Sequence, residues 1–225
     1  MAERNVNIAI DGPSGAGKST IARAVAKALG MLYVDTGAMY RAIGLYAFEN
    51  GIAPRDAAAL GRALADIDIK LAYEGGVQRV FLNGRDVSEA IRRHEISAYA
   101  SDVSALPAVR AFLLDLQRDM AKTHSVIMDG RDIGTVILPH ADIKIFLTAA
   151  AEDRARRRFD ELCAKGETVS YERVLEDVRV RDHNDETRAA APLRPAPDAE
   201  IIDTTGNTLD ESIELILNFV KERLS

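Results

Sequence analysis

The sequence predicts an α/β fold, in which a parallel sheet with helices on both faces carries a small antiparallel β insertion and a helical lid. Short β-branched runs, such as Val6 to Ile10 and Ser125 to Met128, alternate with segments whose apolar residues recur at helical spacing. This alternation favours a parallel sheet. A glycine-rich loop between the first strand and the first helix supports the same class, because such a loop binds phosphate in this position.

The whole chain sets the limits of the prediction. Its 225 residues suffice for one elaborated domain, and 47% hydrophobic with 28% charged residues is an ordinary globular composition. No apolar run approaches a membrane span, and Met1 to Asn5 lack a signal-peptide core, so we expect a cytoplasmic protein with no membrane partner. The net charge of −6 argues against nucleic acid as a partner. We expect a monomer, in which the single Cys163 has a structural role.

The first half of the chain contains the predicted insertion. After the loop helix, Leu32 to Val34 predicts a second strand, and helical sequence then continues to Ala65. The period changes to two from Ile67 to Tyr73, and Val77 to Leu82 predicts a partner strand. Asn83-Gly84 is typical of a type I′ turn. An antiparallel unit is therefore expected at about residues 67–87.

The second half returns to the α/β pattern. Helical sequence from Ser88 passes Pro107, and a buried strand then ends in Asp129-Gly130-Arg131-Asp132. Thr208 and Glu211 predict a capping box at the start of the final helix. The remaining predicted elements are a strand at Ile143 to Leu147, charged helices at Ala151 to Lys165 and Ser170 to Ala190, a proline-rich connection at Pro192 to Pro197, and a short strand at Ile201-Ile202.

The glycine-rich loop fits the phosphate-binding pattern G-x-x-x-x-G-K-[ST]. Its backbone N–H groups and the positive end of the following helix can hold phosphate oxygens. Lys18 can reach the outer phosphates of a nucleotide, and the Ser19 hydroxyl can ligate Mg²⁺. We therefore expect ATP to bind to the loop residues, namely Gly12, Pro13, Ser14, Gly15, Ala16, Gly17, Lys18, Ser19 and Thr20.

A phosphate loop alone does not identify the reaction, but the first charged helix adds basic groups. Arg154, Arg157 and Arg158 are spaced so that they share one helical face. One interpretation is a solvated face paired with the neighbouring acidic residues Glu152, Asp153 and Asp160. In a chain that binds a triphosphate, we favour the second interpretation, in which a closing segment delivers these arginines to the migrating phosphoryl group.

Two further groups point to a second ligand. Arg181, Asp185 and Arg188 lie at steps of four and three, so one face carries two guanidinium groups with a carboxylate between them. The carboxylate can bridge the arginines structurally, or the three residues can bind a nucleotide. Asp129 follows a buried strand, where it can hold Mg²⁺ through water. Arg131 and Asp132 would then face the phosphate acceptor.

Four motifs together resemble the bacterial cytidylate kinase family: GPSGAGKST, DTGAMYRA, DGRDIGTV and RDHNDETRAAAPL. The resemblance extends from about Asn7 to the C-terminal helix. It implies a nucleoside-monophosphate kinase that converts ATP and CMP or dCMP to ADP and CDP or dCDP, with Mg²⁺. It also implies three regions: a core with the phosphate loop (1–35, 105–150 and 195–225), a monophosphate-binding region (36–104), and a lid with a helical arm (151–194).

The resemblance also implies roles for individual residues. Asp132 would accept from the cytosine amino group, and the carbonyl of uracil at that place would leave a buried carboxylate unpaired. Tyr40 would pack beside the base. The implied contacts are Thr36, Arg110, Asp132 and Arg188 to cytosine; Ser101, Arg181 and Asp185 to the sugar; and Arg41, Arg131 and Arg181 to the acceptor phosphate. Lys18, Arg131, Arg154, Arg157 and Arg158 would be the catalytic group.

Two alternatives stay open. One is another small-molecule kinase of the same architecture, acting on UMP, AMP or a sugar acid. The other is a nucleotide-binding switch protein, although the chain has no N-K-x-D guanine-reading motif. An α/β domain without activity is disfavoured by the loop in its strand-to-helix context. The residues predicted to bind the acceptor, above all Thr36, Asp132 and Arg188, distinguish these possibilities.

Overall fold

The computed structural model describes residues 5–75, 77–164 and 166–224. The first four residues, the glycine at position 76 in the predicted turn and the lysine at position 165 that ends a predicted helix lie outside the described residues. Within them, no helix is long and apolar enough to cross a membrane.

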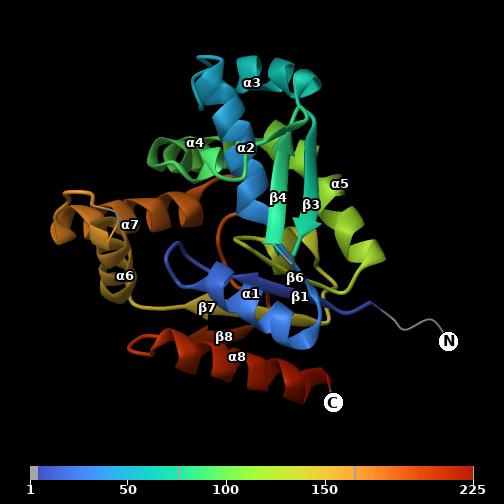
Figure 1. Cartoon of the computed structure of the whole chain (residues 1–225), viewed down its shortest axis with the longest axis vertical. Coiled ribbons are helices and arrows are strands. Elements are labelled where there is room, and N and C mark those ends of the chain that lie inside the picture. The colour runs from blue at the N-terminus through green and yellow to red at the C-terminus, as the bar shows by residue number, and fades with distance from the viewer. Residues whose placement is uncertain (1–4, 76, 165, 225) are drawn as a thin grey trace.

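The centre of the molecule is a five-stranded parallel sheet (Figure 1), which confirms the predicted fold class. Strand order is β2-β6-β1-β7-β8, so that β2 and β8 form the two edges. The register pairs Asp11 with Gly130 and Asp35 with Asp129, which brings three strand ends together at one carboxyl edge. The strands are β1 (Asn7–Asp11), β2 (Leu32–Asp35), β6 (Val126–Gly130), β7 (Ile143–Thr148) and β8 (Glu200–Asp203).

Alternating side chains of the strands face two different cores. Ile8 and Ile10 of β1 pack in a cluster with α1 (Lys18–Leu29) and α8 (Leu209–Leu224). Ala9, between them, belongs to a second cluster formed mainly by α2 (Thr36–Glu49) and α5 (Pro107–Thr123). Because side chains alternate along a strand, each face of the sheet buries its own set of apolar residues.

The antiparallel insertion is also present. It consists of β3 (Ile69–Glu74), β4 (Val77–Leu82) and β5 (Arg85–Asp86), and it lies beside α2 (Figure 1). Asn83 and Gly84 both have positive φ, at 49° and 77°, as a type I′ turn requires.

Two of the long predicted helices are interrupted. The helical sequence expected to reach Ala65 stops at Glu49, because Gly51 adopts a positive φ of 64° and Pro54 follows. A separate short helix, α3 (Ala57–Ala63), begins after its N-cap Asp56. The helix expected to pass Pro107 is likewise two helices, α4 (His94–Ser104) and α5, because proline lacks an N–H group and fits the first helical position.

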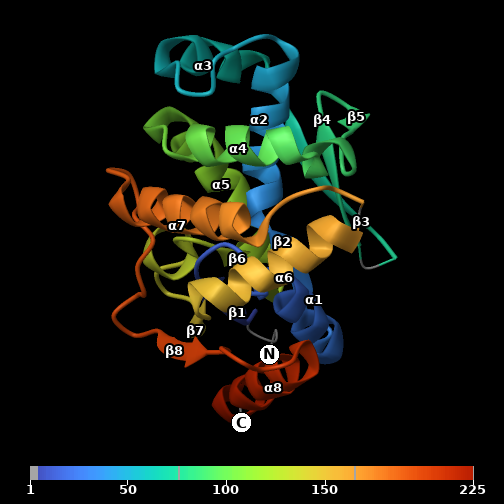
Figure 2. The same ribbon diagram turned by 90° about the vertical axis from the view of Figure 1, so that its left-hand side faces the viewer.

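The lid helices lie over the carboxyl edge of the sheet. Figure 2 shows α6 (Ala151–Ala164) and α7 (Tyr171–Thr187) in front of the strands. They pack against each other through a small core that includes Ala155 and Val178. Cys163 is exposed, so the structural role expected for it is wrong. The capping box at α8 is confirmed, since the Thr208 N–H donates to Glu211 at 2.7 Å and the Glu211 N–H donates back at 3.3 Å.

Candidate active site

The phosphate loop joins β1 to α1, as expected. Gly12 has a φ of +149°, and a Cβ at this position would lie 2.0 Å from the carbonyl oxygen of Leu147. Gly17, the residue before α1, has a φ of +85°. The backbone therefore requires glycine at both positions, and the free N–H groups of the first turn of α1 lie at the loop. Thr20 is exposed on α1.

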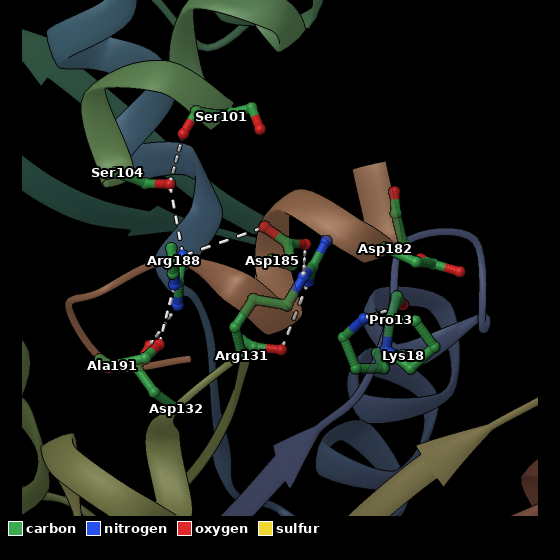
Figure 3. Close-up of polar contacts among 12 residues, drawn as sticks. Pro13, Lys18, Ser101, Ser104, Arg131, Asp132, Asp182, Asp185, Arg188 and Ala191 are labelled. Carbon is green, nitrogen blue, oxygen red and sulfur yellow. Dashed lines mark hydrogen bonds and ion pairs between the residues drawn. The ribbon is translucent and has the colours of Figure 1, made fainter. Parts of the chain in front are cut away.

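Lys18 is buried beneath this loop. Its Nζ donates to the carbonyl oxygen of Pro13 at 2.6 Å, so the side chain curls back over the loop (Figure 3). Burial lowers the pKa of Lys18, and the nearby positive charge of Arg131 lowers it further. A phosphate bound in the loop would relieve both effects, because its negative charge favours the ammonium form.

The predicted metal ligands contact each other. The Ser19 hydroxyl donates to Asp129 at 2.7 Å, and the Tyr33 hydroxyl donates to the other carboxylate oxygen at 2.9 Å. Burial raises the pKa of Asp129, with a further contribution from Asp35. In the described part of the chain, no three His, Cys, Asp or Glu side chains form a metal site by themselves. One hydroxyl and one carboxylate do suit Mg²⁺, which takes hard oxygen ligands and keeps water and nucleotide phosphates as the others.

Four arginines, three from helices and one from the loop after β6, lie near one another close to the phosphate loop. Burial lowers the pKa of Arg181 to about 10, and the positive charges of Arg131, Arg41 and Arg158 act in the same direction. The Nε atom of Arg181 is buried and has no hydrogen-bond partner. Neighbouring cations with an unused buried donor form a site for an anion, because an anion both neutralises the repulsion and satisfies the donor.

Asp185 on α7 lies within this group. Its carboxylate accepts from Arg131 Nε at 2.8 Å and lies 3.9 Å from Arg188 (Figure 3). Burial by itself would raise the pKa of Asp185, but Arg131, Arg181 and Arg188 hold that pKa below its ordinary value. The carboxylate does bridge two arginines, but one of them is Arg131 of a distant loop rather than Arg181 of the same helix. This ion pair therefore joins α7 to the loop after β6.

A second polar cluster contains the residues predicted to bind the base. Asp132 forms ion pairs with Arg110 and, at 3.6 Å, with Arg188. The Arg110 guanidinium lies 5.7 Å above the ring of Tyr40. Burial raises the pKa of Asp132, and the nearby arginines oppose that rise. The Thr36 hydroxyl donates to the backbone oxygen of Asp129 at 2.7 Å, which places it at the end of β6.

The remaining residues predicted to contact the nucleotide lie next to this cluster. Arg188 Nε donates to the carbonyl oxygen of Ala191 at 2.8 Å, and its Nη1 lies 3.4 Å from the hydroxyl of Ser104. Ser104 in turn donates to the carbonyl oxygen of Ser101, as Figure 3 shows. Arg41 lies 3.5 Å from Asp35. The structure thus brings residues from α2, α4, α5, β6 and α7 to one site.

The three arginines of α6 have different partners, and two of them lie against the phosphate loop: a Cβ at Gly15 would lie 3.2 Å from Arg154 Cβ, and one at Gly17 would lie 3.9 Å from Arg157 Nη1. Arg154 donates to the carbonyl oxygens of Ala149 and Ser14 and forms two hydrogen bonds to Asp182, at 3.0 and 2.6 Å. Arg157 donates to the carbonyl oxygen of Thr204 at 3.1 Å. The long side chains diverge because each finds different acceptors on the surrounding loops.

Of the three, Arg158 is near enough to Arg181 for its charge to lower the pKa of that residue. Among the described residues, its ion-pair partner is Glu161, at 3.3 Å. The interpretation of a solvated face is not supported either. Glu152 pairs with Arg179, and Asp153 accepts from the backbone N–H of Gly206.

Sequence reasoning missed several residues that shape the site. Asp11 accepts from the backbone N–H groups of Ile133 and Gly134, both at 2.7 Å. Its position at the end of a buried strand was a usable signal, because ligand-binding groups gather at carboxyl strand ends. Gln78 and Asp182 carried no such signal, since their partners are distant in sequence.

The parallel sheet, the phosphate loop and the arginines facing it define a phosphate-loop kinase. The cytidylate kinase family model matches residues 8–222. The chain therefore belongs to the cytidylate kinase family.

Individual relatives agree with this assignment. The chain is 51% identical over 214 residues to the cytidylate kinase of Caldicellulosiruptor bescii, covering 95% of both chains. It is 50% identical over 215 residues to the cytidylate kinase of Carboxydothermus hydrogenoformans, covering 96% of this chain and 97% of that one. An uncharacterized protein from Eubacterium ventriosum shares the fold, with a TM-score of 0.53 at 12% identity over 97% of this chain and 99% of that chain.

Proposed function

We propose that this protein transfers the γ-phosphoryl group of ATP to CMP or dCMP, giving ADP and CDP or dCDP. The observation that carries the proposal is a pair of side-chain clusters near the phosphate loop. One contains Arg181 with an unused buried donor, and the other contains Asp132 between Arg110 and Arg188. The chemistry of these two clusters suits a phosphate and a base with an amino group.

The chemistry of the cluster around Asp132 favours cytosine as the base. Asp132 can accept from the cytosine amino group, and the arginines can donate to the ring nitrogen and carbonyl. Uracil would place a carbonyl oxygen against the carboxylate, so the buried Asp132 would lose a partner. Tyr40 would pack against the ring, Thr36 would add a hydroxyl, and Ser101 and Asp185 would bind the sugar.

The cluster of arginines around Arg181 favours in-line transfer of the phosphoryl group. Arg41, Arg131 and Arg181 would hold the CMP phosphate, whose oxygen is already anionic near neutral pH, so that no strong general base is needed. The loop amides and Lys18 would hold the ATP phosphates opposite it. Arg158 would approach the migrating group, where developing charge is stabilised by fixed positive groups.

Ser19 and Asp129 would hold Mg²⁺, Asp129 through water. The ion would supply charge neutralisation on the β- and γ-phosphate oxygens. The lid (151–194) would close over both substrates and exclude water that otherwise hydrolyses ATP. We propose a cytoplasmic monomer that acts on these small molecules alone.

A coupled assay of ADP release tests the proposal, with ATP, Mg²⁺ and each of CMP, dCMP, UMP, AMP and a sugar acid in turn. We expect strong stimulation by CMP and dCMP and little by the others. Slow ADP release that no acceptor changes would support a nucleotide switch instead, and stimulation by UMP or AMP alone would identify a different kinase.

A further inference from the structure

The antiparallel insertion reaches the acceptor side of the site through one side chain. Gln78 of β4 accepts at Oε1 from the backbone N–H of Asp35, at 2.9 Å. Its Nε2 donates to the backbone oxygen of the same residue, at 3.2 Å. The amide thus pairs with both backbone groups of one residue, as a neighbouring strand would. Tyr73 of β3 lies 3.4 Å from Gln78 Oε1 and supports it.

Asp35 is the residue at which β2 becomes α2. It is the last residue of an edge strand and the N-cap of the helix, where its carboxylate accepts from the Ala38 N–H at 3.0 Å. The same carboxylate lies 3.5 Å from Arg41. Thr36 follows directly. A shift of the Asp35 backbone would therefore move two residues assigned to the acceptor nucleotide.

We propose that Gln78 is a positioning residue, which holds the Asp35 backbone so that Thr36 and Arg41 are placed for the acceptor monophosphate. This inference rests on the proposed function. The positioning by Gln78 gives the insertion a role in acceptor binding, although the residues proposed to contact CMP all lie outside β3, β4 and β5. Without the amide, Asp35 would keep the pairing of β2 to β6 on the other side of the strand and the contacts of its carboxylate with Ala38 and Arg41, but its backbone would lose both hydrogen bonds to the insertion.

The chain offers a matched control. Arg85 of β5 forms an ion pair with Glu49 at 2.5 Å and so ties the same insertion to the far end of α2. Arg85→Gln removes a tether between the same two parts of the molecule without touching Asp35. A role in attaching the insertion predicts similar effects at both positions, whereas positioning predicts an effect at Gln78 alone.

Gln78→Glu and Gln78→Ala are the test variants. Glutamate keeps the shape but places an oxygen against the Asp35 carbonyl and a charge near its carboxylate, and alanine removes both hydrogen bonds. We expect the KM for CMP to rise about tenfold, the effect of about one lost hydrogen bond, with the KM for ATP within about twofold. Amide exchange at the Asp35 N–H should become faster in both variants.

Arg85→Gln should leave the KM for CMP and the Asp35 exchange rate unchanged. An unchanged KM for CMP in both Gln78 variants would overturn the inference, and so would an equal rise in Arg85→Gln. If the wild-type protein shows no response to CMP, the proposed function falls. In that case, unchanged Asp35 exchange in the Gln78 variants would overturn the contact itself, and faster exchange would support it.

Discussion

Asp11 connects the phosphate loop with the segment that follows β6. It ends β1 directly before the phosphate loop, and its carboxylate binds the first two N–H groups of the π-helical turn Ile133–Ile137. Burial raises the pKa of Asp11 to about 6, although the two backbone hydrogen bonds oppose the rise. Asp132 adds repulsion, and Lys18 opposes it. This carboxyl group therefore titrates in an accessible range.

We expect stability to depend on pH through Asp11. The unfolded chain has the ordinary pKa of 3.8, so between pH 3.8 and about 6 the folded state binds more protons than the unfolded state. The free energy of unfolding contributed by Asp11 therefore falls as the pH rises through this window, by about 3 kcal/mol in total. Urea unfolding of wild type and Asp11→Asn from pH 4 to 7 measures it, and a constant difference between the two proteins would contradict it.

Asp132 should decide which base is accepted. In Asp132→Asn the side chain keeps its size, but it can present its amino group where the carboxylate would accept from cytosine. We expect kcat/KM for CMP to fall about 100-fold, as the loss of a charged hydrogen bond implies, while kcat/KM for UMP falls less. Both substrates are measured with the same variant, so a general loss of folded protein would lower kcat/KM for CMP and for UMP equally. An equal fall would therefore contradict a specific role of Asp132 in choosing the base.

At the scale of the element, α6 shows how one helix serves different tasks. Its three arginines have helical spacing, yet Arg154 joins the loop tip at Ser14 to Asp182 of α7, and Arg157 binds the segment before α8. Arg158 is near enough to Arg181 for its charge to lower the pKa of that residue. The helix thus binds the phosphate loop and α7 through Arg154, and it brings Arg158 near Arg181.

Arg158→Ala should lower turnover more than it weakens ATP binding. Its guanidinium would act mainly on charge that develops in the transition state, so we expect kcat to fall about 100-fold with the KM for ATP changed less than threefold. Steady-state kinetics with CMP in excess measures both constants. Unchanged turnover would remove Arg158 from the transfer step.

Arg154→Met should act instead on stability. The substitution leaves Asp182 without its bidentate partner, and the side chain of Asp182 is only 16% exposed. We expect the free energy of unfolding to fall by about 3 kcal/mol, the order found when one partner of a buried pair is removed. Urea unfolding tests this, with exposed Arg173→Met on α7 as the control, since its ion pair with Asp177 lies at the surface.

At the scale of the whole molecule, the site depends on segments from most of the chain. The phosphate loop comes from the start of the sequence, whereas Arg181 and Asp185 of α7 come from the last third of the chain. Closure of the proposed lid would complete the site only with both substrates present, because each half of the site would bind one of them.

We therefore expect CMP and a non-hydrolysable ATP analogue together to slow amide exchange in α6 and α7 more than either ligand alone. The last turn of α8, far from the carboxyl edge, serves as the internal reference. Hydrogen exchange followed by mass spectrometry measures both regions. Equal protection with one ligand and with two would show that closure does not require the pair.

The sequence by itself determined the phosphate loop, the order of strands and helices, and the family. These depend on local features: periodicity, glycines at positive φ, and contiguous motifs such as DGRDIG. It also located the breaks incompletely, because Gly51 and Pro107 lie inside segments whose composition still favours helix.

Only the tertiary structure decided which side chains meet. It paired Asp185 with Arg131, turned Arg154 toward Asp182, and brought Gln78 to the Asp35 backbone. Each contact joins residues far apart in the chain, and helical spacing fixes only the face on which a side chain starts. Long arginine side chains then reach whichever acceptors the surrounding elements provide, and those acceptors exist only once the chain has folded.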